Sequence, residues 1–247
     1  MKSGPQTGSD VRHGSKNTLL PPQRAGRVPL EECLLKRRSI REYTDSPLTV
    51  ADVAQLVWAA QGVTSEDQRR TAPSAGALYP METYLVALNV EGLASGLYKY
   101  HPEEHSLALI APGSLGRAVA RAALDQDFIQ HAGAVILMAA VNQRTTVKYG
   151  QRGIRYVHME AGHTAQNVCL QATALGLGCV PVGAFDDSGL RQLLQLDADE
   201  EPLYLLPSGE PEEAAWISTV TGTRRSVATA AHGCRWYSEL GNRKTRR

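Results

Sequence analysis

Three arginines and one serine stand within five residues in the stretch KRRSIREY. They are Arg37, Arg38, Ser39 and Arg41, and they follow a short helical pattern at the point where it ends. Guanidinium groups bind phosphate through pairs of parallel hydrogen bonds. The stretch is therefore a candidate phosphate site, and the alternative is a solvated basic helix end that the serine caps.

A run of small residues precedes a clear β-strand pattern in RTAPSAGALYPMETYLVAL. Its members are Pro73, Ser74, Ala75, Gly76 and Ala77. The serine offers a hydroxyl group, and the three residues after it offer backbone N–H groups with little steric cover. Such a loop lets a flat or bulky group approach the backbone, and the alternative is an ordinary connection between a helix and a strand.

A third candidate is the stretch GCVPVGAFDD, which follows a predicted strand. Its central residues are Pro181, Val182, Gly183 and Ala184. The glycine lets a main-chain amide face the edge of a ligand. One of the two aspartates that come next is expected to cap the following helix.

Lys148 and Tyr149 are adjacent, and Arg152 and Arg155 follow closely. A lysine or tyrosine acts as a general base when burial or a neighbouring charge lowers its pKa. The two residues are therefore a candidate catalytic pair, and the alternative is two exposed residues at a helix start. No metal is expected, because the histidines of HMEAGH are five residues apart and lie on different faces of a helix.

Helical and strand patterns alternate between these candidates. Helices are predicted near residues 29–37, 49–62, 114–124 and 150–175, and strands near 83–90, 97–100, 107–110 and 134–141, with two late strands in CVPVGAF and PLYLLPSG. We expect Thr49 and Asp52 to cap the second helix and Gly62 to end it. The order predicts a mixed α+β layer fold. No strand–GxGxxG–helix unit is present, so no nicotinamide-binding Rossmann domain is expected.

The chain has 247 residues, of which 43% are hydrophobic, and a formal net charge of +1. This composition is ordinary for a globular protein and points neither to nucleic acid nor to a membrane as partner. The four cysteines show no CxxC spacing, so we expect reduced, mostly buried thiols in a cytoplasmic protein. We expect a disordered basic tail over residues 1–18, one domain over 19–222 and a basic tail over 223–247.

Three segments, residues 20–63, 70–110 and 149–187, together resemble the nitroreductase-like flavoprotein superfamily. Within it they resemble the SagB-type branch, the dehydrogenases that form thiazoles and oxazoles in peptides by oxidising azoline rings. The resemblance extends from about Leu20 to Pro211. It depends on the order and spacing of all four motifs rather than on any one of them.

The resemblance implies a three-layer α+β fold with a mostly antiparallel central sheet flanked by helices. It also implies an intertwined homodimer with FMN at the dimer interface. Residues 37–41 then match the stretch that holds the FMN phosphate and ribityl chain, and residues 73–77 match the loop that the partner subunit lays against the flavin. Residues 181–184 match the segment that faces the flavin ring near its reactive nitrogen. Lys148 and Tyr149 match a Lys-Tyr pair implicated as catalytic in the azoline dehydrogenases.

The sequence departs from the family after the last strand, where many nitroreductases place a further basic residue on the phosphate. The stretch PSGEPEEAAW is acidic there, and Arg224 and Arg225 come late. The expected function is FMN-dependent oxidation of azoline rings in a peptide. The alternatives are NAD(P)H-dependent reduction of small nitroaromatics or quinones, and a catalytically degenerate flavin-binding subunit of a peptide-modifying complex.

Overall fold

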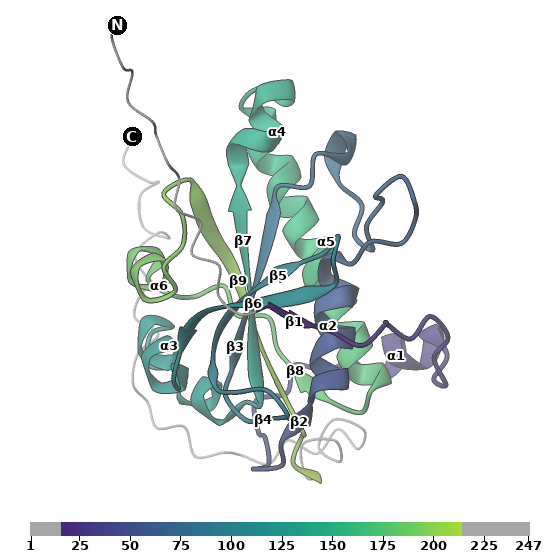
Figure 1. The fold of residues 1–247 in the computed structure, drawn as a ribbon, viewed down its shortest axis with the longest axis vertical. Helices are drawn as coiled ribbons and strands as arrows, with labels where there is room; N and C mark the ends of the chain where they lie inside the picture. The colour runs from purple at the N-terminus through teal and green to yellow at the C-terminus, as the bar shows by residue number, and fades with distance from the viewer. Residues whose placement is uncertain (1–15, 214–247) are drawn as a thin grey trace, which may run out of the picture.

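The centre of the molecule is a seven-stranded sheet with the order β1-β6-β5-β3-β7-β9-β8 (Figure 1). A computed structural model of the chain describes residues 16–213. All neighbouring strands of this sheet pair antiparallel. The strands are β1 (Lys16–Thr18), β3 (Met81–Ala87), β5 (Gly96–His101), β6 (Ser106–Pro112), β7 (Ala134–Val141), β8 (Gly178–Cys179) and β9 (Glu200–Gly209). Two short strands, β2 (Leu48–Thr49) and β4 (Val90–Glu91), pair parallel outside it.

Helices cover both faces of the sheet and complete three layers (Figure 1). On one face lie α2 (Val50–Gln61) and α5 (Arg152–Ala174), with α1 (Leu30–Lys36) packed on α5. On the other face lie α3 (Gly116–Ala122), the 3-10 helix η2 (Asp127–His131) and α6 (Asp187–Leu193). The predicted α+β fold with a central antiparallel sheet is confirmed.

Strand β7 shows why the sheet lies at the centre. All eight of its residues, AVILMAAV, are buried. Because side chains alternate along a strand, Ile136 and Met138 pack towards α2 and α5, while Val135 and Leu137 pack towards α3 and α6. A strand covered on both faces needs such an unbroken apolar run.

The ends of α2 form as the sequence predicts. Thr49 accepts the backbone N–H of Asp52 at 3.1 Å, and the Asp52 carboxylate accepts the N–H of Thr49 at 2.9 Å. This capping box satisfies two N–H groups that the first helical turn leaves free. Gly62 follows the last helical residue. The predicted caps of α2 are therefore confirmed.

Three predictions need correction or stay open. Residues 16–18 pair with β6 as β1, although the sequence predicts that they belong to a disordered tail. The strand predicted over 83–90 starts at Met81 and ends at Ala87, and Val90 belongs to β4. Residues 223–247, including Arg224, Arg225 and Cys234, lie outside the described residues.

None of the helices within residues 16–213 is long and apolar enough to span a membrane.

Lys148 and Tyr149 do not stand at the start of the long helix. They end a separate helix, α4 (Asn142–Tyr149), which the sequence analysis missed. Gly150 separates the two helices, with a φ of 55° that a right-handed helix does not allow. The long helix predicted over 150–175 is confirmed as α5, and α4 projects beyond the sheet at the top of Figure 1.

Candidate functional site

Residues 37–41, the arginine segment, leave the end of α1 in an extended conformation. Ser39 forms a parallel bridge with Cys179, and the N–H of Ile40 donates to the Cys179 carbonyl at 3.2 Å. Backbone contacts therefore fix the segment along β8. Beneath it, Cys169 and Cys179 are buried thiols, as the sequence predicts, and so is Cys33 in α1.

The three arginine side chains of this segment have different environments. Arg38 is exposed and donates to the carbonyls of Leu35 and Arg37, so it caps the end of α1. The guanidinium of Arg41 lies 5.8 Å from the centre of the Phe128 ring, and Arg37 is half-buried. None of the three forms an ion pair with a carboxylate within residues 16–213. Their charges therefore remain available to an anion.

Residues 181–184, the edge segment, follow β8 and pair with β9. Val182 and Leu205 exchange two backbone hydrogen bonds, at 2.8 and 2.9 Å. Gly183 and Ala184 are exposed, and Gln126 donates to the Ala184 carbonyl at 2.9 Å. Because the arginine segment pairs with Cys179 and the edge segment follows it directly, the structure brings these two predicted stretches together.

Residues 73–77, the glycine loop, form a tight turn ahead of β3. Gly76 and Ala77 have positive φ angles of 65° and 55°. The backbone N–H of Tyr79 donates to the Ser74 hydroxyl oxygen at 2.9 Å and closes the turn. The loop borders a hollow of about 400 Å³, which Arg69, Arg70, Ala72, Pro73, Ser74, Gly76, Ala77 and Tyr79 line.

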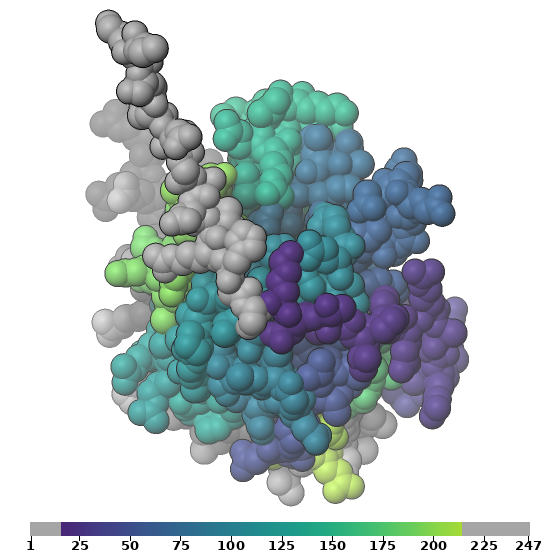
Figure 2. Space-filling view, viewed as in Figure 1, coloured from purple at the N-terminus to yellow at the C-terminus, as the bar shows by residue number. Residues whose placement is uncertain are grey.

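The predicted catalytic pair contacts this loop. A methyl group added at Gly76 would lie 2.9 Å from the Tyr149 hydroxyl oxygen and 3.0 Å from Lys148 Nζ. A residue larger than glycine would therefore displace the ends of these two side chains, besides being strained at this φ. The Tyr149 ring also meets the edge of Tyr156, with centroids 5.1 Å apart. Figure 2 shows α4, in teal at the top, beside the blue segment that precedes β3.

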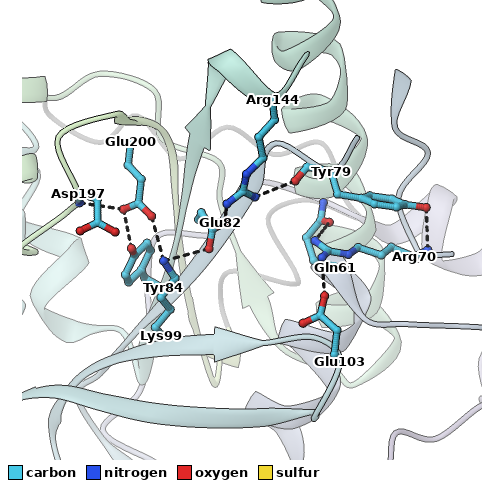
Figure 3. Close-up of polar contacts among 10 residues, drawn as sticks. All are labelled: Gln61, Arg70, Tyr79, Glu82, Tyr84, Lys99, Glu103, Arg144, Asp197 and Glu200. Carbon is cyan, nitrogen blue, oxygen red and sulfur yellow. Dashed lines mark hydrogen bonds and ion pairs between the residues drawn. The ribbon is translucent and has the colours of Figure 1, made fainter. Parts of the chain in front are cut away.

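Arg144 anchors α4 to Tyr79, two residues after the glycine loop, and to the sheet (Figure 3). Its guanidinium donates to the Tyr79 carbonyl at 3.0 Å and forms an ion pair with Glu82 of β3. Glu82 and Glu200 each lie 3.0 Å from Lys99 Nζ. These contacts fix the helix that carries the predicted catalytic pair.

The charges in this network support one another. Burial opposes ionisation of Glu82, but Lys99 and Arg144 outweigh it and lower the pKa of Glu82. Burial would likewise lower the pKa of Lys99, and the two carboxylates outweigh it and raise that pKa. These residues were not predicted from the sequence. The only signals were single charges within the apolar strand patterns at Glu82 and Lys99, whereas Glu200 stands among other acidic residues.

Within one chain the candidate residues fall into two groups. The edge segment lies outside β9, while the glycine loop leads into β3, and β7 stands between β3 and β9. The path between the two groups across the sheet therefore crosses three strand spacings of about 4.8 Å each. The arginine and edge segments form one group, and the glycine loop with Lys148 and Tyr149 forms the other.

The family to which this architecture belongs follows from a match to a known protein family. A family model described as the nitroreductase family matches residues 34–210. This chain belongs to the nitroreductase family. The match includes all four predicted motifs, so the resemblance to this superfamily is confirmed.

Two relatives bear on the branch within the nitroreductase family. A protein of Methanocaldococcus jannaschii named as a nitroreductase is 50% identical over 186 residues, which are 75% of this chain and 93% of that protein. The microcin B17-processing protein McbC of Escherichia coli is 31% identical over 136 residues, 52% of this chain and 49% of that protein. The second relative is about twice as long as the part that matches.

Solved nitroreductases share the fold. A structure from Anabaena variabilis has a TM-score of 0.72 at 29% identity, over 85% of this chain and 45% of that one. A structure from Desulfovibrio desulfuricans, solved in complex with FMN, has a TM-score of 0.55 at 21% identity, over 76% of this chain and 88% of that one. This nitroreductase-family chain thus spans less than half of the Anabaena protein.

Proposed function

We propose that this nitroreductase-family oxidoreductase binds FMN as a homodimer and forms each site from two chains. One protomer contributes the arginine and edge segments, and the other contributes the glycine loop. The observation that carries this proposal is that two whole strands, β7 and β9, stand between the two groups within one chain. A symmetric dimer is the common arrangement in which a second copy supplies a segment that one chain cannot place.

The residues of both groups fit FMN. The arginine segment offers Arg37 and Arg41, which have no carboxylate partner within the described residues, to the phosphate. The glycine loop and the exposed backbone at Gly183 offer close approach to a flat ring. The FMN-bound fold neighbour supports the same cofactor. Bound FMN supplies the hydride chemistry, while the protein binds, orients and shields the reacting groups.

The proposed reaction is oxidation of an azoline ring in a peptide. The ring loses a hydride and a proton as it becomes aromatic, and Lys148 is the group proposed to accept the proton at Nζ. Tyr149, which lies beside Lys148 at the glycine loop, orients that amine. Similarity to the microcin B17-processing protein supports a peptide substrate.

A second candidate is reduction of nitroaromatics or quinones with a nicotinamide nucleotide. The 50% identity to the Methanocaldococcus protein named as a nitroreductase favours it. The two candidates differ in the direction of electron flow at the same site. Incubation of the purified, flavin-loaded protein with an azoline peptide, and separately with NADPH and a nitroaromatic, tests them. Bleaching of the flavin by the azoline peptide without oxygen supports the first candidate. Bleaching by NADPH alone supports the second.

A mixed dimer tests the two-chain site. One chain carries Arg37→Glu and Arg41→Glu, the other carries Gly76→Val, and each variant alone should lose FMN. Co-expressed under two affinity tags, the mixed dimer should bind one FMN, because one of its two sites combines an intact arginine segment with an intact glycine loop. If every site belongs to one chain, the mixed dimer binds none and the proposal fails. A flavin-loaded monomer in sedimentation would contradict the two-chain site as well.

A further inference from the structure

Cys169 of α5 and Cys179 of β8 are in contact beneath the arginine segment. Both thiols are free, their relative exposures are 2% and 3%, and their sulfur atoms lie 4.0 Å apart. This contact is a weak hydrogen bond between two thiols, and the proposed oxidation uses neither of them. Two thiols that meet in this way can be oxidised to a disulfide. The pair is therefore a candidate redox site.

The backbone of β8 connects Cys179 to the arginine segment. The Cys179 carbonyl accepts the N–H of Ile40 at 3.2 Å, and Cys179 also forms a parallel bridge with Ser39. Next to it, a methyl group added at Gly178 would lie 2.6 Å from the Ile40 side chain, so the strand and the segment are closely packed. A displacement of Cys179 is therefore passed directly to residues 39 and 40.

The backbones of the two cysteines are held with different firmness. Cys169 lies inside α5, a helix of 23 residues, and its carbonyl also accepts the Thr173 hydroxyl at 2.9 Å. β8 has two residues, stands at the edge of the sheet and pairs there with β9. A short edge strand opens more readily than the middle of a long helix. When the two sulfur atoms approach each other, the movement is therefore expected at Cys179.

We propose that Cys169 and Cys179 form a reversible disulfide that displaces β8 and loosens the arginine segment, so that oxidation weakens the binding of a phosphate-bearing ligand there. A bond requires the sulfur atoms to come closer than their present contact. The displaced Cys179 carbonyl then releases the N–H of Ile40. The effect on binding rests on the proposed FMN site, whereas the bond and the loosening of Ile40 do not.

The oxidant is hydrogen peroxide, which is small enough to reach a buried thiol when the edge strand opens. The Cys169 sulfur attacks one peroxide oxygen, the O–O bond breaks, and water leaves as a sulfenic acid forms. The Cys179 sulfur then attacks the Cys169 sulfur, the S–O bond breaks, and a second water leaves as the disulfide forms. Two thiols thus lose two electrons and two protons, and one peroxide becomes two waters.

Cys169 is the thiol assigned to the first attack. The hydrogen bond with Cys179 lowers the pKa of Cys169, burial opposes this change, and the charge of Arg37 supports it. The same hydrogen bond and burial raise the pKa of Cys179. Because the thiolate is the nucleophile, the thiol that ionises first attacks the peroxide.

Peptide mapping of the full chain tests whether the bond forms. No lysine or arginine lies between Arg155 and Arg191, so trypsin releases both cysteines on one peptide, residues 156–191. After treatment with hydrogen peroxide, this peptide should lose the mass of two hydrogen atoms and resist alkylation, and dithiothreitol should reverse both changes. Cys33→Ser, which removes a buried thiol of α1, should behave like the parent, whereas Cys169→Ser should not lose this mass. An unchanged peptide, a sulfinic acid or a bond to another cysteine overturns the inference.

Two further measurements on the same proteins test the consequence of the bond. In the flavin-free protein, amide hydrogen exchange at Ile40 should accelerate about two- to tenfold on oxidation, the worth of one hydrogen bond. FMN affinity should fall by a similar factor and return with dithiothreitol, in the parent and in Cys33→Ser but not in Cys169→Ser. A disulfide that leaves the Ile40 exchange or the FMN affinity unchanged overturns the inference. If no variant binds FMN in either state, the cofactor proposal fails, and the Ile40 exchange still decides this inference.

Discussion

The arginine segment and the glycine loop are held by different kinds of contact. Backbone pairing with Cys179 fixes the arginine segment, so its charged side chains are left for a ligand. Side chains fix the glycine loop, through Ser74 within it and through Arg144, which donates to the Tyr79 carbonyl two residues after it. The backbone of the arginine segment holds it in place, and its arginine side chains are left for a ligand. The glycine loop is held by hydrogen bonds to side chains.

This difference predicts how each region responds to mutation. A side-chain change in the arginine segment should alter ligand binding and leave the fold intact, because neither Arg37 nor Arg41 forms an ion pair with a carboxylate within residues 16–213. A change around the glycine loop should alter stability as well as chemistry, because a buried group such as Glu200 would lose partners.

The largest effect is expected at the catalytic pair. Lys148→Ala and Tyr149→Phe should each slow azoline oxidation by about 100- to 10,000-fold, the usual contribution of a positioned base. Flavin content should stay at the parent's level, and so should reduction of a quinone by chemically reduced flavin, which needs no such base. Rates of product formation under single-turnover conditions measure the loss.

Val147→Ala is the matched control, since Val147 is 80% exposed on the same helix. It should oxidise the azoline peptide at the parent's rate. If Lys148→Ala and Tyr149→Phe do so too, the base assignment is wrong and the pair only shapes the glycine loop.

A large stability effect is expected at Lys99, which lies between two carboxylates. Lys99→Met leaves Glu200, at 2% exposure, without its cation and should lower the free energy of unfolding by about 3–5 kcal/mol. Glu82 has a lowered pKa, so its contribution is present above its ordinary pKa and is lost as the pH falls. The deficit of Lys99→Met should therefore be larger at pH 8 than at pH 4.

Urea unfolding at both pH values measures this deficit. Lys99→Arg keeps the charge and should recover most of the stability. An equal deficit for Lys99→Met at both pH values would show that packing, rather than charge, gives Lys99 its role.

The two regions also differ in what their sequence reveals. The arginine segment is visible as a motif because its residues are adjacent, and α2 and β7 are visible because capping and apolar runs are local signals. The network of Glu82, Lys99 and Glu200 cannot be recognised in the sequence, because it depends on the register of strands that are distant in sequence. The break at Gly150 was missed for a related reason, since a positive φ in a glycine leaves no pattern in the residues around it.

A moderate stability effect is expected at Glu160 of α5, whose relative exposure is 2%. Burial raises its pKa in the fold from 4.5 to about 7, so the unfolded chain releases the proton first as the pH rises. Stability should then fall across this window, by up to about 3 kcal/mol. Glu160→Gln has no such proton and should gain that amount relative to the parent between pH 5 and pH 8.

Chemical unfolding of both proteins at pH 5 and pH 8 checks the prediction, with Glu91→Gln, a change at an exposed carboxyl in β4, as control. The parent and Glu91→Gln should lose stability alike. Parallel pH dependence in Glu160→Gln would mean that Glu160 is ionised throughout this range.

The smallest effect is expected in the arginine segment. Arg37→Ala or Arg41→Ala should weaken FMN binding by about tenfold or more, because a charge-assisted hydrogen bond is worth roughly 1.5–3 kcal/mol. Riboflavin, which lacks the phosphate, should bind these variants as it binds the parent.

Arg117→Ala removes an exposed arginine from α3 and controls for the change in net charge. The unfolding midpoints of Arg37→Ala and Arg41→Ala should match the parent's, because the segment is held by its backbone pairing with Cys179 and by the buried side chain of Ile40, which these variants keep. Equal losses of affinity for FMN and riboflavin would show that these arginines do not bind the phosphate. A lowered unfolding midpoint would show that the arginine side chains also stabilise the fold.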